Sequence, residues 1–161
     1  MELVGYDGYK HIKGTKIHAL VSSEALLLSI QVGPGYEHDS KIFIKLLEDV
    51  KIKHSRGKPR SRPKEVTSDS AYDIKEIREY LKRRGVKANI DVNPRNRRKP
   101  KRGRPYRLDR KSYKRMRSAV ERFFAWITLF KRLSIRYERL ASTFLGFIQI
   151  ACIIIHLRVL Q

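Results

Sequence analysis

The sequence predicts an α/β fold with a mixed sheet flanked by helices, and three observations support this. Two β-forming segments, 17–21 and 26–32, flank a short polar loop, which is typical of an antiparallel hairpin. Residues 65–92 have the pattern of strand, helix and strand, which favours a parallel crossover unit. Two apolar helical patterns, beginning near residues 109 and 144, supply long helices to cover the sheet.

Length and charge limit the function classes. With 161 residues, the chain is expected to form a single domain over 1–161. Its 37 Lys and Arg against 16 Asp and Glu give a formal net charge of +21, which predicts attraction to a polyanion, nucleic acid first. An acidic membrane surface is the weaker alternative, because the basic residues are spread over loops and several helices rather than one amphipathic helix.

Cysteine content and hydropathy indicate an intracellular protein without a membrane partner. Cys152 is the only cysteine, so the chain can build no internal disulfide and no cysteine zinc site. The first residues lack the pattern of a signal peptide. The apolar segment 144–160 is shorter than a typical membrane span and is interrupted by polar or small residues, so we expect a buried helix. The interrupting residues are Gly146, Gln149, His156 and Arg158.

In the first half of the chain, residues 6–9 favour a turn before the hairpin, and 33–35 are expected to stop its second strand. His38-Asp39-Ser40 supplies an N-cap signal for a helix over about 40–51. Residues 51–64 contain seven Lys or Arg together with Gly57, Pro59 and Pro63, so we expect a solvated basic loop that does not fold internally.

The second half begins with a strand over 65–68 and a helix over 74–84 that Gly85 closes. A strand over 86–92 follows, with alternate apolar residues on one face. A second basic loop covers about 93–108. Helical pattern resumes near Asp109, a polar break follows at 136–139, and Ser142-Thr143 is expected to cap the last helix, 144–160.

Two acids are the candidates for chemistry. Asp69 follows the 65–68 strand where the backbone turns toward a helix, a position that points a carboxylate out of a sheet edge toward a ligand or metal. Glu121 lies within a strongly apolar helical pattern, where a half-buried acid needs a partner. We expect folding to bring the two together. The alternatives are that Asp69 and Asp73 are ordinary helix caps and that Glu121 is an exposed residue beside the apolar stripe.

These residues occur in an order that resembles the DDE transposases of bacterial and archaeal insertion sequences, over about residues 7–160. The resemblance implies an RNase H-like core that lacks its first strand. It rests on the segments Lys13-Gly14-Thr15-Lys16-Ile17-His18, Gly35-Tyr36-Glu37-His38-Asp39-Ser40, Asp69-Ser70-Ala71-Tyr72-Asp73, Arg117 through Phe124, and the closing apolar helix.

The resemblance implies a two-metal site for Mg²⁺ or Mn²⁺, in which three carboxylates hold the ions at a phosphodiester. One ion activates water or a 3′-hydroxyl and the other stabilises the leaving oxygen. Hard cations require oxygen ligands, and Asp69 and Glu121 match the family's second aspartate and its glutamate. Arg117 matches an arginine one turn before that glutamate, which holds a phosphate or orients the acid.

The chain departs from the family pattern in three places. The family's first aspartate lies on a strand upstream of Lys13, so this chain is expected to be N-terminally truncated. Either Asp7 or an upstream transposase fragment is then left to supply the third carboxylate. Tyr113 lies four residues before Arg117 rather than three. The family's lysine seven residues after the glutamate is replaced by Thr128, and Lys131 is expected one turn along on roughly the same face.

The function expected from this resemblance is metal-dependent DNA strand cleavage and transfer in transposition, by a cytoplasmic, nucleoid-associated protein. Its partners would be the insertion-sequence ends, target DNA and a second copy of the chain. One alternative is an inactive truncated remnant that binds DNA nonspecifically; another is a basic RNA-binding or ribosome-associated protein. The residues expected to contact DNA are Arg117, Lys131, Arg95, Arg97, Arg98, Lys99, Lys101, Arg102 and Arg104.

Overall fold

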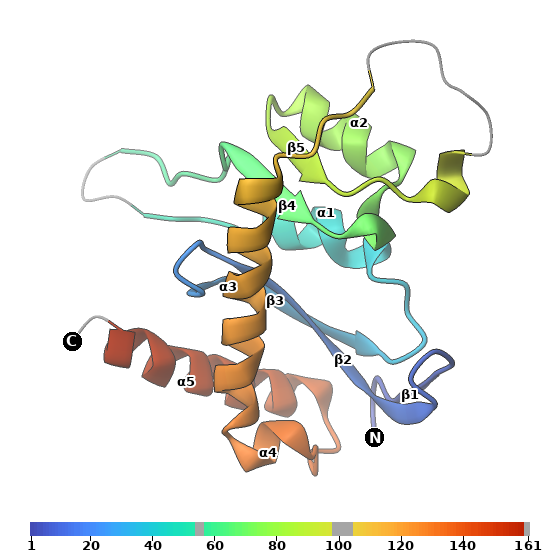
Figure 1. The fold of residues 1–161 in the computed structure, drawn as a ribbon. Helices are drawn as coiled ribbons and strands as arrows, with labels where there is room; N and C mark the ends of the chain where they lie inside the picture. Colours follow the sequence, from blue (N-terminus) through green and yellow to red (C-terminus); the bar gives the residue numbers. More distant parts are fainter. Residues whose placement is uncertain (54–56, 98–104, 160–161) are drawn as a thin grey trace. The chain divides into compact units, whose positions relative to one another are not determined.

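A computed structural model describes residues 1–53, 57–97 and 105–159 and confirms the α/β class (Figure 1). The chain divides into two compact units, and each is described by itself. Unit 1 comprises Met1–His38 and Ser118–Gln161, and unit 2 comprises Asp39–Arg117. Unit 1 holds a three-stranded antiparallel sheet and unit 2 a two-stranded parallel one, so both kinds of strand pairing predicted from the sequence are present.

The sheet of unit 1 has the order β1-β2-β3, with β1 at Gly5–Asp7, β2 at Ile12–Val21 and β3 at Leu27–Pro34. The predicted hairpin is confirmed in β2 and β3, which lie side by side as the two long strands of Figure 1. Strand β3 ends at Pro34, within the predicted stop at 33–35, but it extends two residues beyond the predicted strand 26–32, because Gly33 and Pro34 still pair with Lys16 and Thr15. A proline is tolerated there since β3 is an edge strand.

The predicted turn near residues 6–9 connects β1 to β2. The Asp7 carboxylate accepts hydrogen bonds from the backbone N–H groups of Tyr9 (2.9 Å) and Lys10 (3.2 Å). The bond from Lys10 and then that from Tyr9 hold the pKa of Asp7 below its usual value. In this structure Asp7 is therefore the residue that forms the turn.

The helices of unit 1 are the C-terminal part of α3 (Arg110–Thr128), the short α4 (Lys131–Ser134) and α5 (Ala141–Val159). The sequence pattern did not predict α4. By length and composition α5 is the one helix in the described residues that could cross a membrane, and five of its residues are buried within unit 1. The core of unit 1 combines the hairpin with α3, α4 and α5 through Val21, Ile30, Phe123, Ile127, Leu133, Phe144, Ile148 and Cys152.

The predicted start of the last helix is wrong by three residues. The helix α5 begins at Ala141, so Ser142 and Thr143 lie inside its first turn. The carboxylate of Glu2 accepts a hydrogen bond from the Ala141 N–H at 2.9 Å and takes over the capping role. A residue 139 positions away in the sequence therefore supplies the partner that a local pattern assigned to Ser142.

Unit 2 contains the predicted parallel crossover. Strand β4 (Glu65–Ser68) is followed by the 3₁₀ turn η1 (Ser70–Tyr72), helix α2 (Lys75–Arg83) and strand β5 (Lys87–Ile90), which pairs with β4 in parallel register. Gly85, at φ +63°, ends α2 in the left-handed conformation that favours glycine, as predicted. Strand β5 stops at Ile90, two residues before the predicted end.

The helix α1 (Ser40–Glu48) stops three residues before its predicted end, and its N-cap signal does not act as expected. Asp39 occupies the N-cap position in helical conformation and its side chain makes no capping hydrogen bond. The helix is instead held by its apolar face, through the buried side chains of Phe43, Leu46 and Leu47. Packing rather than capping thus fixes α1.

The two basic loops are more ordered than predicted in the parts that the structure describes. Ile52 and Arg60 pair through two backbone hydrogen bonds of 2.9 and 2.8 Å, which form an isolated antiparallel bridge. In the second segment, Pro94–Arg97 forms the 3₁₀ turn η2. Residues 54–56 and 98–104 lie outside the described part of the chain.

Candidate catalytic site and its supports

Asp69 lies immediately after β4 in extended conformation and caps η1. One carboxylate oxygen, Oδ1, accepts a hydrogen bond from the Ala71 N–H at 2.9 Å. The side chain is exposed, and within the described residues Oδ2 has no hydrogen-bond partner. The capping interpretation is thus correct for one oxygen, and the second oxygen faces solvent in a position suited to a ligand.

The neighbour of Asp69 in this turn is Tyr72, whose ring packs on Phe43 with centroids 5.3 Å apart. Burial of the phenol, and then the negative charges of Asp39 and Asp69, raise the pKa of Tyr72 well above its usual value. The hydroxyl therefore stays protonated throughout the physiological range. Asp69 therefore lies beside a neutral, partly buried aromatic residue.

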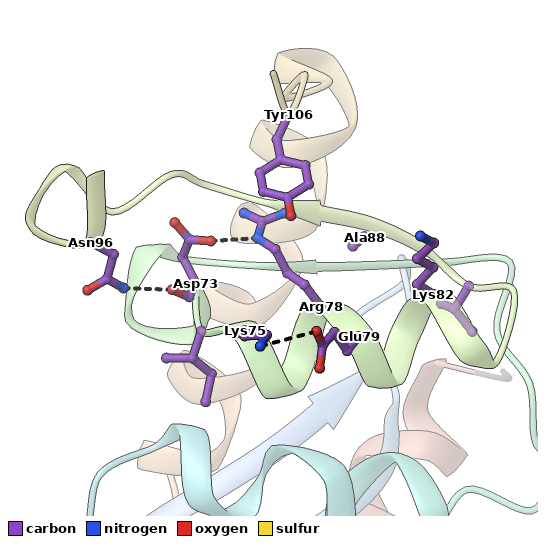
Figure 2. A pocket seen from close by; sticks show the side chains of 10 residues that line it. Asp73, Lys75, Arg78, Glu79, Lys82, Ala88, Asn96 and Tyr106 are labelled. Carbon is purple, nitrogen blue, oxygen red and sulfur yellow. Dashed lines mark hydrogen bonds and ion pairs between the residues drawn. The ribbon is translucent and has the colours of Figure 1, made fainter. Parts of the chain in front are cut away.

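Asp73, at the other end of the turn, is buried and holds three segments together (Figure 2). Its Oδ1 accepts from Arg78 Nε at 2.5 Å, its Oδ2 from the Asn93 N–H at 2.8 Å, and its carbonyl from Asn96 Nδ2 at 2.7 Å. The expectation that Asp73 caps a helix is wrong. Ile74 occupies the N-cap position of α2, because the Asp73 carboxylate is engaged by the buried Arg78.

Arg78 extends this connection to β5 and to the segment before α3. Its Nη2 donates to the Ile90 carbonyl at 3.1 Å, and its guanidinium carbon lies 3.9 Å from the centre of the Tyr106 ring. Figure 2 shows the guanidinium between the Asp73 carboxylate and that ring. The three groups form part of the wall of an open pocket of about 820 Å³, which Lys75, Lys82, Val86, Ala88 and Asn96 also line.

The first turn of α3 is held by a second polar group. Asp109 Oδ1 accepts from the Ser112 N–H at 3.1 Å, which caps the helix where the sequence predicted its start. This bond is the main cause that lowers the pKa of Asp109. Glu65 of β4 accepts from the Ser112 hydroxyl at 2.6 Å and pairs with Lys87 of β5 at 2.6 Å. Burial opposes ionisation of Glu65, yet these bonds keep its pKa below the usual value.

Glu121 and Arg117 lie one turn apart on α3, and both are exposed. The expectation of a half-buried acid is wrong for Glu121. The apolar stripe of α3 buries Ala119, Phe123 and Ile127, and residue 121 lies about 200° around the helix from 119 and 123. Asp69 belongs to unit 2 and Glu121 to unit 1. That the two carboxylates lie close together therefore stays a prediction.

Lys131 does not continue the face of α3. The helix ends at Thr128, Phe130 adopts extended backbone angles, and Lys131 begins α4. The hydroxyl of Thr128 bonds back to the Ala125 carbonyl, and Ser134 Oγ donates to the Thr128 carbonyl, which stabilises this break. The prediction of Lys131 on the same helical face is therefore wrong, although Lys131 is exposed.

The remaining predicted DNA contacts lie in or near η2. Arg95 is exposed, and its backbone N–H donates to Asn93 Oδ1 at 3.0 Å. Arg97 is the last residue of η2. The others lie outside the described residues, and their role stays a prediction: Arg98, Lys99, Lys101, Arg102 and Arg104.

The donor chemistry of the two acids fits a hard divalent cation, because both present exposed carboxylate oxygens. In the part of the chain that the structure describes, no group of three or more His, Cys, Asp or Glu side chains is arranged to hold a metal ion. The role of Asp69 as a metal ligand stays a prediction.

Local sequence signals missed three buried polar residues, Asp73, Arg78 and Asn89. A signal was present for one of them. Arg78 lies between Ile77 and Leu81 on the apolar face of α2, whereas Asn89 alternates with Lys87 and Asp91 on what the sequence shows as a polar face of its strand. A polar residue at a core position indicates a buried hydrogen-bonding partner.

Comparison with known proteins identifies the family. No solved structure matches the chain. A Brucella ovis protein named "Putative transposase for insertion sequence element IS6501" is 31% identical over 146 residues, which cover 89% of this chain and 98% of that protein. A Burkholderia cepacia protein named "Putative transposase for insertion sequence element IS402" is 28% identical over 143 residues, 88% of this chain and 62% of that protein. The model of the transposase DDE domain matches residues 2–155, and the chain belongs to this family.

Proposed function

We propose that the chain is a catalytic domain of an insertion-sequence transposase that cleaves and transfers DNA strands with divalent metal ions. The observation that carries the proposal is the position of Asp69, directly after β4 with one carboxylate oxygen facing solvent, in a chain of the transposase DDE family. Asp69 and Glu121 would hold Mg²⁺ or Mn²⁺, with a further carboxylate completing the site.

The chain's own residues would act by position and charge. The Ala71 N–H fixes the Asp69 carboxylate through Oδ1, so Oδ2 is oriented before a ligand arrives. Arg117, one turn before Glu121, would orient that acid or bind a phosphate oxygen of the strand. When bound, the ions would activate the attacking hydroxyl and stabilise the leaving oxygen.

DNA binding is proposed from the charge of the chain. A net charge of +21 over 161 residues favours release of counterions from a phosphate backbone. Arg95, Arg97 and Lys131 would join the basic residues at 98–104 in contacting the insertion-sequence ends and target DNA. We place this activity in the cytoplasm at the nucleoid, and a second copy or an upstream transposase fragment as a partner.

The test is strand cleavage by the purified chain with Mn²⁺ and a duplex that carries the ends flanking its coding sequence. We expect nicked product that is lost in Asp69→Asn and in Glu121→Gln. The matched control is Glu76→Gln, an exposed acid in the first turn of α2, which should cleave like the wild type. Loss of cleavage in the control, or cleavage that survives both site variants, would contradict the assignment.

An inactive DNA-binding remnant is the second candidate, and the absence in the described residues of a three-residue metal group favours it. It predicts duplex binding that weakens steeply with salt and is equal in wild type, Asp69→Asn and Glu121→Gln, without cleavage in Mn²⁺. Adding the upstream fragment of the same element separates the two candidates, because only the catalytic domain gains cleavage from it.

A further inference from the structure

Asn89 is the most buried polar side chain of unit 2, with 1% of its surface exposed. It lies in β5 and binds the backbone of Asp109 from both ends of its amide. Its Nδ2 donates to the Asp109 carbonyl at 3.1 Å, and its Oδ1 accepts from the Asp109 N–H at 2.9 Å. The Asn89 amide thus binds both the N–H and the carbonyl of Asp109, as the backbone of a neighbouring strand would. It connects strand β5 to a residue 20 positions later in the sequence.

Asp109 is the residue that starts α3. Its carbonyl accepts from the Tyr113 N–H at 2.9 Å, which is the first helical bond, and its carboxylate caps Ser112. The amide of Asn89 therefore fixes the backbone of the N-cap itself. The pairs Glu65–Ser112 and Lys87–Asp109 add contacts from β4 and β5 to the same turn.

The contacts from Asn89, Glu65 and Lys87 fix the first turn of α3, and so define the axis of the part of this helix that belongs to unit 2. That part runs from Arg110 to Arg117. In the same unit, β4 pairs with β5 residue by residue, with Ser68 opposite Ile90, and Asp69 follows Ser68. The strand that holds Asn89 is therefore also the strand that holds the base of the Asp69 turn.

We propose that Asn89 is a positioning residue that sets the direction of the first two turns of α3, Arg110–Arg117, relative to the Asp69 turn, all within unit 2. The inference rests on the proposed function for its importance in catalysis, since it gives Asp69 and Arg117 one common support. The physical requirement is directional: two hydrogen bonds in a buried site define an orientation, whereas an apolar side chain of similar size would fill the space without defining one.

The experiment measures the distance between spin labels by pulsed electron resonance in the full chain. Labels are placed at Glu76→Cys on α2 and Lys114→Cys on the unit 2 part of α3, both exposed, in a Cys152→Ala background. We expect a narrow distance distribution that broadens in Asn89→Asp, which loses the donor to the Asp109 carbonyl, and in Asn89→Ala. The matched control is Val86→Ala, a buried apolar residue of unit 2, which should destabilise the unit and keep the distribution narrow.

A distribution unchanged in both Asn89 variants would overturn the proposal. A readout on the wild type needs no variant: hydrogen exchange at the Asp109 N–H should be slow, like that of the β5 amides. Exchange as fast as that of exposed loop amides would overturn the proposal as well.

Mn²⁺ binding separates this inference from the proposed function. If Asp69 holds the ion, Asn89→Ala should weaken Mn²⁺ binding about tenfold, the lower end of the range for residues that orient ligands, because β5 pairs with the strand that leads into the Asp69 turn. If the wild type binds no Mn²⁺ with the two acids, the proposed function fails. The label distances and the exchange of Asp109 still decide the positioning role.

Discussion

The two units of this chain differ in how their buried charged groups are paired. In unit 1, the hairpin and the helices α3, α4 and α5 meet in one buried cluster of apolar side chains, and the buried Glu138 pairs with an Arg132 side chain that is 62% exposed. In unit 2, an apolar core is supplemented by buried polar residues, Asp73, Arg78 and Asn89, each bonded to a segment far along the chain. Asp69 belongs to the second unit, at a turn surrounded by directional contacts.

This difference concerns how precisely a side chain is placed. Apolar burial is roughly proportional to area and has no direction, so a packed cluster stabilises a helix more than it orients a loop. Hydrogen bonds in a dry site fix orientation, and leaving one partner unpaired is costly. We expect unit 1 to respond to lost volume and unit 2 to lost polar partners.

The largest effect is expected in the core of unit 1. Phe123 of α3 has 1% of its surface exposed, and Phe123→Ala should lower the free energy of unfolding by ~4 kcal/mol through lost burial and a residual cavity. Chemical denaturation followed by circular dichroism measures the loss. Leu129→Ala is the control, because Leu129 is 75% exposed and should change stability by less than ~0.5 kcal/mol.

Unit 2 should be most sensitive to the loss of a buried charge partner. The Asp73 and Arg78 side chains form such a pair and are 4% and 9% exposed. Arg78→Ala leaves a buried carboxylate without its charge partner and should cost ~3 kcal/mol or more. The double variant Asp73→Leu with Arg78→Met removes both charges and should recover much of that loss. A double variant that is as unstable as the single one would contradict this account, and denaturation midpoints of the three proteins decide.

Cys152 reports on unit 1 alone and tests whether the units respond separately. It is buried among the core residues of α5, and burial raises the pKa of its thiol to about 11. Thiol labelling at pH 8 should therefore be slow in the wild type and should accelerate in Phe123→Ala. In Arg78→Ala it should accelerate much less, and equal acceleration in the two variants would show that the units open together.

Much of the fold was predictable because its signals are local. The alternation of the hairpin, the strand-helix-strand order of residues 65–92 and the start of a helix near Asp109 each depend on neighbours in sequence. The predictions that failed depend on distant partners. Glu2 caps α5 in place of Ser142, and the Arg60 backbone pairs with Ile52 in a segment that composition assigned to a solvated loop.

The candidate site divides in the same way. Asp69 was predictable because its position after a short strand is a local pattern. The residues that support it were not predictable. Asp73 has the sequence context of a helix cap, although its carboxylate binds Arg78. Asn89 alternates with Lys87 and Asp91 as on an exposed strand face, although its amide binds the backbone of Asp109. The break after Thr128 that removes Lys131 from α3 depends on the hydroxyl of Ser134, six residues away.

The smallest expected effect concerns the exposed charges around the start of α3. The bond to Ser112 is the main cause that lowers the pKa of Asp109, and hydrogen bonds from Lys87 and Ser112 lower that of Glu65 despite its burial. The bond to Glu65 raises the pKa of Lys87. A carboxylate whose pKa is lowered by folding stabilises the fold at pH values above its ordinary pKa near 4. This stabilisation is lost as the pH falls through the lowered pKa.

The pH dependence of stability that Lys87 contributes has the opposite sign to that of the two carboxylates. Its contribution to stability is fully present below the ordinary lysine pKa of about 10.4 and is lost as the pH rises through the raised pKa. Lys87→Met should therefore reduce the dependence of the unfolding midpoint on pH at both the acid and the alkaline end, by less than either loss above, because Lys87 is 57% exposed. Lys75→Met is the control, since Lys75 pairs only loosely with Glu79 at 3.8 Å. A Lys87→Met profile parallel to the wild type at both ends would show that apolar packing and the Asn89 bonds alone hold the first turn of α3.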